Sequence, residues 1–184
     1  MAELDGRIAV VTGASRGIGR AAALALAAAG AHIVALARTQ GALEELDDAI
    51  REIGGSATLV PLDIKDFDAL DRLGAALYER WGKLDILFAN AGLLGGLSPL
   101  GHYDQKIWDD VMAVNVTANW RLIRSLDPLL QASDAGRVIV TSSGAAHNAR
   151  AYWGPYAISK AAVEALARTY AAETVTTPVR VMMV

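Results

Sequence analysis

Short apolar runs alternate with helical patterns of apolar and polar positions along the chain. The apolar runs are rich in β-branched residues, as expected for strands that are buried on both faces of a parallel sheet. They span residues 7–12, 32–37, 58–62, 84–89, 137–142 and 179–184. The helical patterns span residues 17–29, 41–53, 66–81, 103–131 and 156–176. This alternation predicts βαβ units and one doubly wound parallel sheet, an α/β architecture of the Rossmann type.

In a sheet of this kind, ligands bind beyond the carboxyl ends of the strands, at the point where the strand order reverses. The motifs described below lie directly after a strand or at the start of a helix, except Asn115 and Lys160, which lie within helices. We therefore expect the binding site at the carboxyl edge of the sheet.

A glycine-rich turn joins the first strand to the first helix, with Gly13, Gly17 and Gly19 spaced Gly-x-x-x-Gly-x-Gly. The N–H groups of such a turn can approach a phosphate, and the helix N-terminus adds partial positive charge. The spacing differs from the Gly-x-Gly-x-x-Gly of the standard dinucleotide fingerprint. Glycines that serve only helix–strand packing are the alternative, but the strand–turn–helix context favours phosphate binding.

Tyr156 and Lys160 stand four residues apart on a predicted helix, so their side chains lie on one face. A free phenol is almost fully protonated at neutral pH, and a nearby ammonium favours the phenolate. Ser143 lies upstream, just after a predicted strand. The Tyr-x-x-x-Lys spacing alone is common by chance, and the glycine-rich turn at the other end of the chain is what makes a catalytic role the better interpretation.

Composition narrows the function classes. The 184 residues suit a single domain, and a net charge of −3 with both signs scattered gives no basic patch for nucleic acid. There is no cysteine, and the three histidines lack metal-ligand spacing, so we expect no metal site. The alanine-rich run 21–37 divides into helix, turn and strand, which argues against a membrane span. The N-terminus does not resemble a signal peptide, and we expect a cytoplasmic protein.

These motifs together resemble the classical short-chain dehydrogenase/reductases, and the resemblance runs from Leu4 to Val184. The family's Thr-Gly-x-x-x-Gly-x-Gly matches Thr12 to Gly19, and its Asn-Ala-Gly matches Asn90 to Gly92. Its acidic residue after the third strand, its helix asparagine and its serine, tyrosine and lysine are matched by Asp63, Asn115, Ser143, Tyr156 and Lys160.

The resemblance implies a set of cofactor-binding residues. They are Gly13, Ser15, Arg16, Gly17, Ile18, Gly19, Arg38, Asp63, Ile64, Asn90, Ala91, Gly92, Tyr156 and Lys160. Asp63 and Ile64 would hold the adenine through a side-chain acceptor and a backbone N–H, although Asp63 is also suited to cap the next helix. Ala89 stands where many members have asparagine, a departure that bears on stability more than on chemistry.

Cofactor choice depends on the end of the second strand. In the family, an aspartate at the position of Ala37 would bind the ribose 2′-hydroxyl and repel a 2′-phosphate. Here Ala37 is followed by Arg38, and Arg16 resembles the second basic residue of NADP-preferring members. Two guanidiniums suit a phosphate, whereas either arginine alone could be an ordinary solvated side chain. We predict NADP(H).

The resemblance implies hydride transfer between the nicotinamide and a substrate carbon. Ser143 would donate a hydrogen bond to the carbonyl oxygen, Tyr156 would exchange the proton, and Lys160 would hold the ribose and favour the phenolate. Asn115 would open its helix locally and hold a water that leads to Lys160; an asparagine that is merely tolerated there is the alternative. Ser142 could compete with Ser143, but the spacing to Tyr156 favours Ser143.

The segments after Gly92 and between Ser143 and Tyr156 are expected to line the substrate pocket. Their side chains are mainly apolar or aromatic, with His147 and Arg150 among them, which suggests an apolar ketone or secondary alcohol. The leading hypothesis is an NADP-dependent carbonyl reductase or alcohol dehydrogenase. A catalytically silent dinucleotide-binding module is the alternative.

Family members continue past the sixth strand with a substrate lid, a helix and a seventh strand, so we expect the chain to be part of a longer one. We also predict a homodimer or homotetramer, because the two helices over residues 103–131 and 156–176 carry more apolar residues than one sheet face can cover. The candidate interface residues are Trp108, Met112, Trp120, Leu129, Leu166 and Tyr170. Trp120 is also suited to the core.

Overall fold

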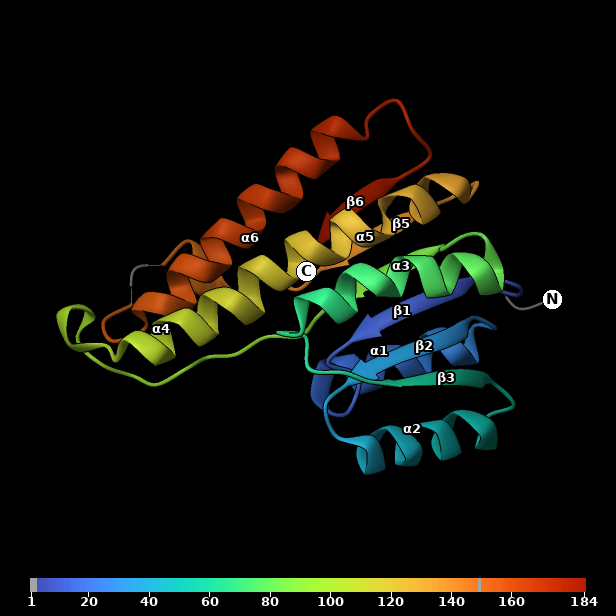
Figure 1. Cartoon of the computed structure of the whole chain (residues 1–184), viewed down its shortest axis with the longest axis horizontal. Helices are drawn as coiled ribbons and strands as arrows, with labels where there is room; N and C mark the ends of the chain where they lie inside the picture. The colour runs from blue at the N-terminus through green and yellow to red at the C-terminus, as the bar shows by residue number, and fades with distance from the viewer. Residues whose placement is uncertain (1–2, 149) are drawn as a thin grey trace.

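The computed structural model describes residues 3–148 and 150–184 and contains one parallel sheet. Its strands lie in the order β3-β2-β1-β4-β5-β6 (Figure 1). They are β1 Ile8–Thr12, β2 His32–Ala37, β3 Ser56–Pro61, β4 Ile86–Ala89, β5 Arg137–Val140 and β6 Arg180–Met183. The doubly wound α/β fold predicted from the alternating pattern is confirmed.

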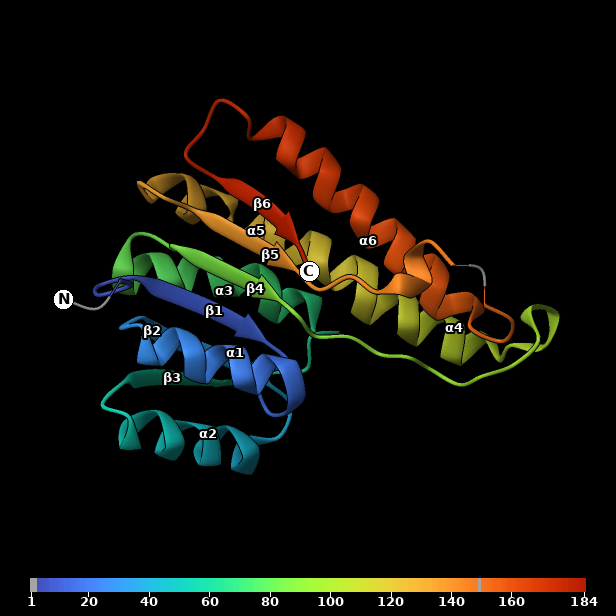
Figure 2. The ribbon, with the colours of Figure 1, turned by 180° about the vertical axis from the view of Figure 1, so that it is seen from behind.

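Helices cover both faces of the sheet (Figures 1 and 2). The helices α1 Gly17–Ala28 and α2 Gln40–Glu52 pack on one face. The helices α3 Phe67–Trp81, α5 Ala118–Ala132 and α6 Gly154–Glu173 pack on the other. The remaining helical segments are α4 Gln105–Met112, the π-helical segment η2 Ala113–Thr117, and the short 3₁₀ turns η1 Leu100–His102 and η3 Gly144–Ala146.

The register of the strands explains why they read as continuous apolar runs. One row of paired residues crosses neighbouring strands and points toward α3, α5 and α6. It consists of Val34, Val10, Leu87, Val138 and Val181. The residues that alternate with them along the central strands point toward α1 and α2. Both faces of the central strands β1, β2 and β4 are therefore buried, and nearly all of their positions are apolar.

At the edge of the sheet beyond β5, the face on the α1 side lacks a helix in the described part of the chain (Figure 2). Val181 packs into the core on the opposite face, whereas Met182 is 44% exposed. The helices in the described residues therefore cover only one face of β6.

Several predicted boundaries differ from the structure. Strand β3 begins at Ser56 rather than residue 58, because it pairs with β2 from the start and the His32 ring bonds the hydroxyls of Ser56 and Thr58 at 2.8 and 2.9 Å. The helix expected over residues 103–131 is not continuous. Asp104 caps α4 by accepting from the N–H of Lys106, and the π-helical segment separates α4 from α5.

Two residues predicted to lie at a subunit interface are instead core residues. Leu129 and Tyr170 are both buried within this chain, and the Tyr170 hydroxyl donates to Asp127 at 2.6 Å. They are covered because α5 and α6 pack against each other as well as on the sheet. Trp120, in contrast, is 46% exposed and is not a core residue.

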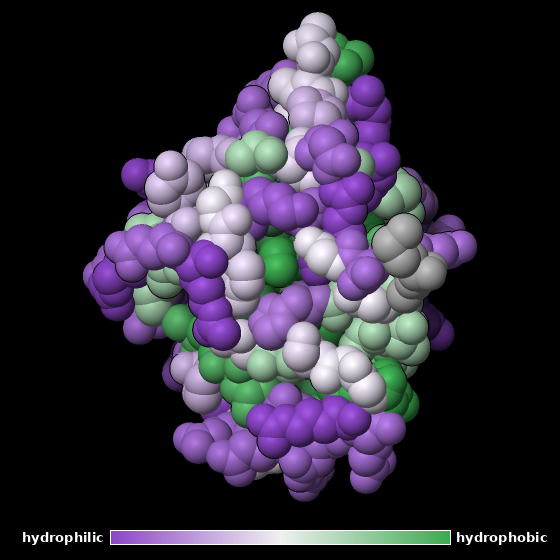
Figure 3. Space-filling view, turned by 90° about the vertical axis from the view of Figure 1, so that its right-hand side faces the viewer, coloured by the Kyte–Doolittle hydropathy of each residue, from purple (hydrophilic) through white to green (hydrophobic). Residues whose placement is uncertain are grey.

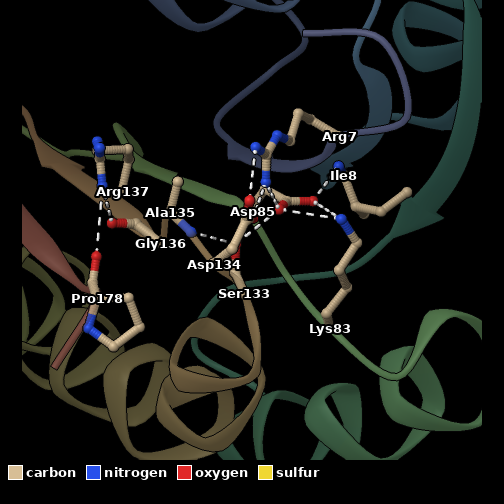
Figure 4. A network of polar contacts seen from close by, with 10 residues as sticks. All are labelled: Arg7, Ile8, Lys83, Asp85, Ser133, Asp134, Ala135, Gly136, Arg137 and Pro178. Carbon is tan, nitrogen blue, oxygen red and sulfur yellow. Dashed lines mark hydrogen bonds and ion pairs between the residues drawn. The ribbon is translucent and has the colours of Figure 1, made fainter.

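A buried carboxylate joins the amino ends of three strands, at the opposite edge from the predicted site (Figure 4). Asp85, which is 1% exposed, accepts from the N–H of Ile8 at 2.9 Å and from the Ser133 hydroxyl at 2.6 Å. Arg7 and Lys83 lie 2.8 and 3.0 Å from it. Burial alone would raise the pKa of Asp85, but the hydrogen bonds from Ser133, Arg7, Ile8 and Lys83 hold it below its usual range.

The face of the molecule in Figure 3 is mainly polar, with apolar patches between the polar side chains. None of the helices in the described ranges is long and apolar enough to cross a membrane.

Candidate dinucleotide-binding and catalytic site

A cavity of about 410 Å³ opens where the strand order reverses, beyond the ends of β1, β2, β3 and β4. Most of the predicted cofactor-binding residues line it: Gly13, Ser15, Arg16, Gly17, Ile18, Arg38, Asp63, Ile64, Asn90, Ala91 and Gly92. Gly19, Tyr156 and Lys160 do not line this cavity. The position of the cavity agrees with the general rule for ligand binding in doubly wound sheets.

The glycine-rich turn brings its backbone close to the end of β4. Gly13 has φ +64°, and a Cβ there would lie 3.0 Å from the Cα of Ala91. A Cβ on Gly19 would lie 2.3 Å from the carbonyl oxygen of Gly13, so that close contact requires glycine. Gly19 therefore does not line the cavity, but its lack of a side chain allows the first turn of α1 to pack directly against the glycine-rich turn.

Thr12 and Asn90 fix the two strand ends that flank the cavity. The Thr12 hydroxyl accepts from the N–H groups of Asn90 and Ala91, both at 3.0 Å. The Asn90 amide donates to the Thr12 carbonyl at 3.1 Å and accepts from the Thr141 hydroxyl at 3.3 Å. Asn90 thus joins β1, β4 and β5, a tie between strands that is made although Ala89 replaces the family's asparagine.

Two arginines and one alanine form the part of the cavity at the end of β2. Arg16 and Arg38 both line the cavity and are exposed, whereas Ala37 is buried at the end of the strand. No acidic side chain occupies the position of Ala37, and the two guanidiniums give this part of the cavity positive charge. A phosphate would find donors here from both sides.

Asp63 is not the cap of the following helix. That role belongs to Asp66, whose side chain accepts from the N–H of Ala69 at 2.9 Å. One oxygen of Asp63 accepts from the N–H of Lys65 at 2.9 Å, and the residue lines the cavity. The capping alternative considered from the sequence is therefore wrong.

An ion pair joins two separate segments that line the same cavity, and it was not predicted from the sequence. Lys65, after β3, lies 2.7 Å from Asp110 on α4, and Lys106 lies 2.8 Å from the other oxygen of Asp110. The two lysines hold the pKa of Asp110 at about 2, with Lys106 the larger cause. Nothing in the local sequence pattern brings residues 65 and 110 together.

Asn115 lies within the π-helical segment and is only 1% exposed. Its side-chain oxygen accepts from the N–H of Leu93 at 2.7 Å, and its amide donates to the carbonyl of Leu93 at 2.9 Å. The amide also donates to the Ser159 hydroxyl at 2.9 Å. The local opening of the helix at Asn115 is as expected, and π-helical insertions of this kind are frequent at functional sites.

Ser159, which was not singled out from the sequence, connects Asn115 to the start of α6. Its hydroxyl accepts from Asn115 and donates to the main-chain carbonyl of Tyr156 at 2.8 Å. Ser159 thereby links the two hydrogen bonds between Asn115 and Leu93 to the first turn of α6.

Tyr156 and Lys160 share one face of α6, as their spacing predicts. The ammonium of Lys160 lies 5.7 Å from the centroid of the Tyr156 ring, and Trp153 contacts the same ring edge-on at 5.8 Å. Lys160 is buried, and burial lowers its pKa. Its ammonium and the side-chain oxygen of Asn115 both lie beside Gly92, at 3.8 and 3.6 Å from the position of a Cβ there.

Ser143 follows β5 and caps the 3₁₀ turn η3, its hydroxyl oxygen accepting from the N–H of Ala145 at 3.2 Å. That contact uses the oxygen as an acceptor and leaves the O–H able to donate. The hydroxyl of Ser142, in contrast, donates to Glu164. This difference agrees with the choice of Ser143 over Ser142 that was made from spacing alone.

The matching family model, described as short chain dehydrogenase, covers residues 7–184. One curated relative, the uncharacterized oxidoreductase YciK of Escherichia coli (strain K12), is 38% identical over 173 residues, covering 92% of this chain and 69% of its own length. Another, the uncharacterized NAD-dependent oxidoreductase Rv0687 of Mycobacterium tuberculosis (strain ATCC 25618 / H37Rv), is 39% identical over 184 residues, covering 92% and 66%.

Among solved structures, a metagenomic short-chain oxidoreductase in complex with NADP superimposes with a TM-score of 0.94 at 35% identity, covering 98% of this chain and 82% of that one. The parallel sheet and the cavity at its switch point already define a nucleotide-binding type of α/β protein. The chain belongs to the classical short-chain dehydrogenase/reductase family, whose members are oxidoreductases that use a nicotinamide dinucleotide. It spans about two thirds of the length of the two curated relatives above.

Proposed function

We propose that this protein is an NADP(H)-dependent oxidoreductase that interconverts an apolar ketone or aldehyde with the corresponding alcohol. The observation that carries the proposal is the convergence on Gly92: the ammonium of Lys160 and the amide of Asn115 meet at the end of the switch-point cavity. Tyr156 lies on the same helix face as Lys160. A buried cation thus adjoins a cavity of dinucleotide-binding type, and the proposed general acid lies one helical turn before that cation.

The residues present fit a dinucleotide. The glycine-rich turn has open space at Gly17, where a Cβ would meet nothing within 4 Å, and it lies at the N-terminus of α1. Such an N-terminus favours a phosphate. When bound, the nicotinamide would donate or accept the hydride.

The side chains of the chain have separate tasks in this proposal. Ser143 donates a hydrogen bond to the substrate oxygen and Tyr156 gives or takes the proton. Lys160 stabilises negative charge on the phenol oxygen and contacts the ribose. Asn115 fixes Leu93 and, through Ser159, the first turn of α6.

The 2′-phosphate preference rests on Ala37, Arg38 and Arg16, which leave the end of β2 positively charged. The metagenomic relative was solved with NADP, which agrees with this preference, while Rv0687 is named NAD-dependent. The cofactor choice of this chain therefore follows from its own residues rather than from the family.

An apolar substrate is supported by exposed side chains in the segments that were expected to line the substrate pocket. Leu94, Leu97 and Leu100 follow the end of β4, and Tyr152 precedes α6; all are exposed. The hydroxyl of Tyr103 donates to the carbonyl of Tyr152, so the two segments lie against each other.

The protein assembles as a homodimer or homotetramer through α5 and α6. Trp120 supports this, because it is exposed on α5 with the guanidiniums of Arg121 and Arg124 at 5.1 and 5.7 Å from its ring. Aromatic and arginine side chains are enriched at interfaces. A monomer in sedimentation at micromolar concentration would contradict the assembly and leave the enzymatic proposal intact.

The reaction is tested by mixing the protein with NADPH and acetophenone, cyclohexanone or benzaldehyde. We expect loss of NADPH absorbance with at least one of these carbonyl compounds, and formation of the alcohol. A protein that binds NADPH but turns over none of them would overturn the proposed substrate class and favour the catalytically silent module.

A further inference from the structure

Glu164 is a buried carboxylate that the proposed reaction does not use. Its side chain is 7% exposed and lies on α6, one turn beyond Lys160 and two turns beyond Tyr156. Residues at this spacing share one face of a helix. Glu164 therefore continues the face that carries the proposed acid–base pair.

Three side chains surround this carboxylate. The Ser142 hydroxyl donates to Oε1 at 2.5 Å, and Nε2 of His147 lies 3.1 Å from the same oxygen. Arg168 donates to Oε2 at 3.1 Å. His147 and Arg168 are 68% and 57% exposed, so Ser142 is the inner partner. The hydrogen bond from Ser142 is the main reason that the pKa of Glu164 is below its usual range, against the effect of burial.

The contacts with Ser142 and His147 hold the segment that carries Ser143 against α6. Lys160 donates to the main-chain carbonyl of Thr141 at 2.6 Å, and Glu164 accepts from Ser142. Ser143 is the next residue, with extended backbone, and His147 contacts Glu164 from the other side of the 3₁₀ turn. Ser143 is thus bracketed by contacts to two consecutive turns of one helix face.

Ser143 and Tyr156 come from different elements, and within the described residues no hydrogen bond joins their side chains. Their relative position depends on how the segment after β5 sits on α6. A hydrogen bond to a buried charged group is among the stronger ones in a protein and has a defined geometry. The Ser142–Glu164 bond is of this kind, and Ser142 is the residue directly before Ser143.

We propose that Glu164 is a positioning residue that, through Ser142, holds the Ser143 hydroxyl in place relative to Tyr156. The inference rests on the proposed function, because it assigns Glu164 a part in the same reaction. It predicts that loss of the Ser142–Glu164 bond slows turnover and leaves the cofactor cavity unchanged, since neither residue lines that cavity.

The test compares Glu164→Ala, Glu164→Gln, Ser142→Ala and the double variant Ser142→Ala/Glu164→Ala. The carbonyl substrate is whichever of acetophenone, cyclohexanone and benzaldehyde the wild type reduces fastest. Glu173→Ala is the matched control, an exposed glutamate near the end of the same helix. For each variant, kcat, the Kd for NADPH and the melting temperature are measured.

We expect kcat to fall about tenfold in Glu164→Ala and in Ser142→Ala, with the Kd for NADPH within about twofold of wild type. The double variant should be no slower than the slower single variant, because both changes remove the same bond. Glu164→Gln retains an oxygen that can accept from Ser142 and should recover part of the rate. Glu173→Ala should match wild type.

The positioning role is overturned if Glu164→Ala and Ser142→Ala both retain wild-type kcat while Tyr156→Phe is inactive; the proposed function then stands. Additive losses in the double variant, or equal losses in kcat and NADPH affinity, also contradict it. If Glu164→Ala does not fold, Ser142→Ala alone decides. A fully active Tyr156→Phe would instead refute the proposed function itself.

Discussion

The ammonium of Lys160 donates a hydrogen bond of 2.6 Å to the main-chain oxygen of Thr141, directly after β5. This contact places a buried cation from α6 at the carboxyl end of the sheet, beside Gly92. Burying an ammonium disfavours its charged form, and one carbonyl is incomplete compensation. Burial of the Lys160 ammonium therefore lowers the stability of the protein. A buried cation of this kind is a candidate functional group.

The first prediction follows from the lowered pKa of Lys160. A lysine whose pKa is lower in the folded than in the unfolded state binds fewer protons when folded, so the stability of the cofactor-free protein rises with pH between the two pKa values. The unfolded value is about 10.4. Relative to Lys160→Met, wild type should gain free energy of unfolding as the pH rises toward about 10, measured by urea denaturation. If the difference in free energy of unfolding between wild type and Lys160→Met did not change with pH, the prediction would be contradicted.

The second prediction concerns cofactor preference. Wild type should bind NADPH at least about tenfold more tightly than NADH, which corresponds to ~1.4 kcal/mol. Ala37→Asp places a carboxylate next to Arg38 and should reverse the preference, whereas Ala37→Asn adds similar volume without charge and should not. Fluorescence titration of both cofactors measures this. Equal or tighter binding of NADH by wild type would refute the NADP assignment.

The third prediction concerns Asp85 and the amino edge of the sheet (Figure 4). Asp85→Asn removes the charge that Arg7 and Lys83 face and should lower the free energy of unfolding by about 3 kcal/mol near neutral pH. The folded-state pKa of Asp85 is depressed, so its contribution is fully present above the unfolded pKa of about 3.9 and is lost as the pH falls through the folded value. The difference in free energy of unfolding between wild type and Asp85→Asn should therefore become smaller only below about pH 4. NADPH affinity should not change, because this network lies at the far edge from the cavity.

The periodicity of the chain was sufficient to predict the sheet, because strands buried on both faces must be apolar throughout. It also located the cavity, since the carboxyl ends of parallel strands lie at one edge. The resemblance to the family identified Asn115, an interior asparagine is unfavourable in a helix, and the structure has a π-helical segment there. These features depend on local pattern or on simple topology.

Other features depend on packing that the pattern does not encode. Lys65 and Asp110, or Ser142 and Glu164, meet only because separate elements pack together, and each residue alone resembles an ordinary surface charge or hydroxyl. Tyr170 was predicted to lie at a subunit interface because an apolar residue on a helix such as α6 can be buried either within its own chain or against a second subunit. In the structure, Tyr170 is buried within its own chain because α6 packs against α5.

The central claim is that Tyr156 is the acid–base group of a dinucleotide-dependent oxidoreductase. Tyr156→Phe keeps the ring that packs against Trp153 and removes only the hydroxyl. The most direct measurement is the single-variant comparison of kcat and NADPH affinity in Tyr156→Phe and wild type. We expect kcat to fall by at least about a hundredfold with the Kd for NADPH close to wild type. A variant that kept more than about a tenth of the wild-type kcat would show that another residue moves the proton.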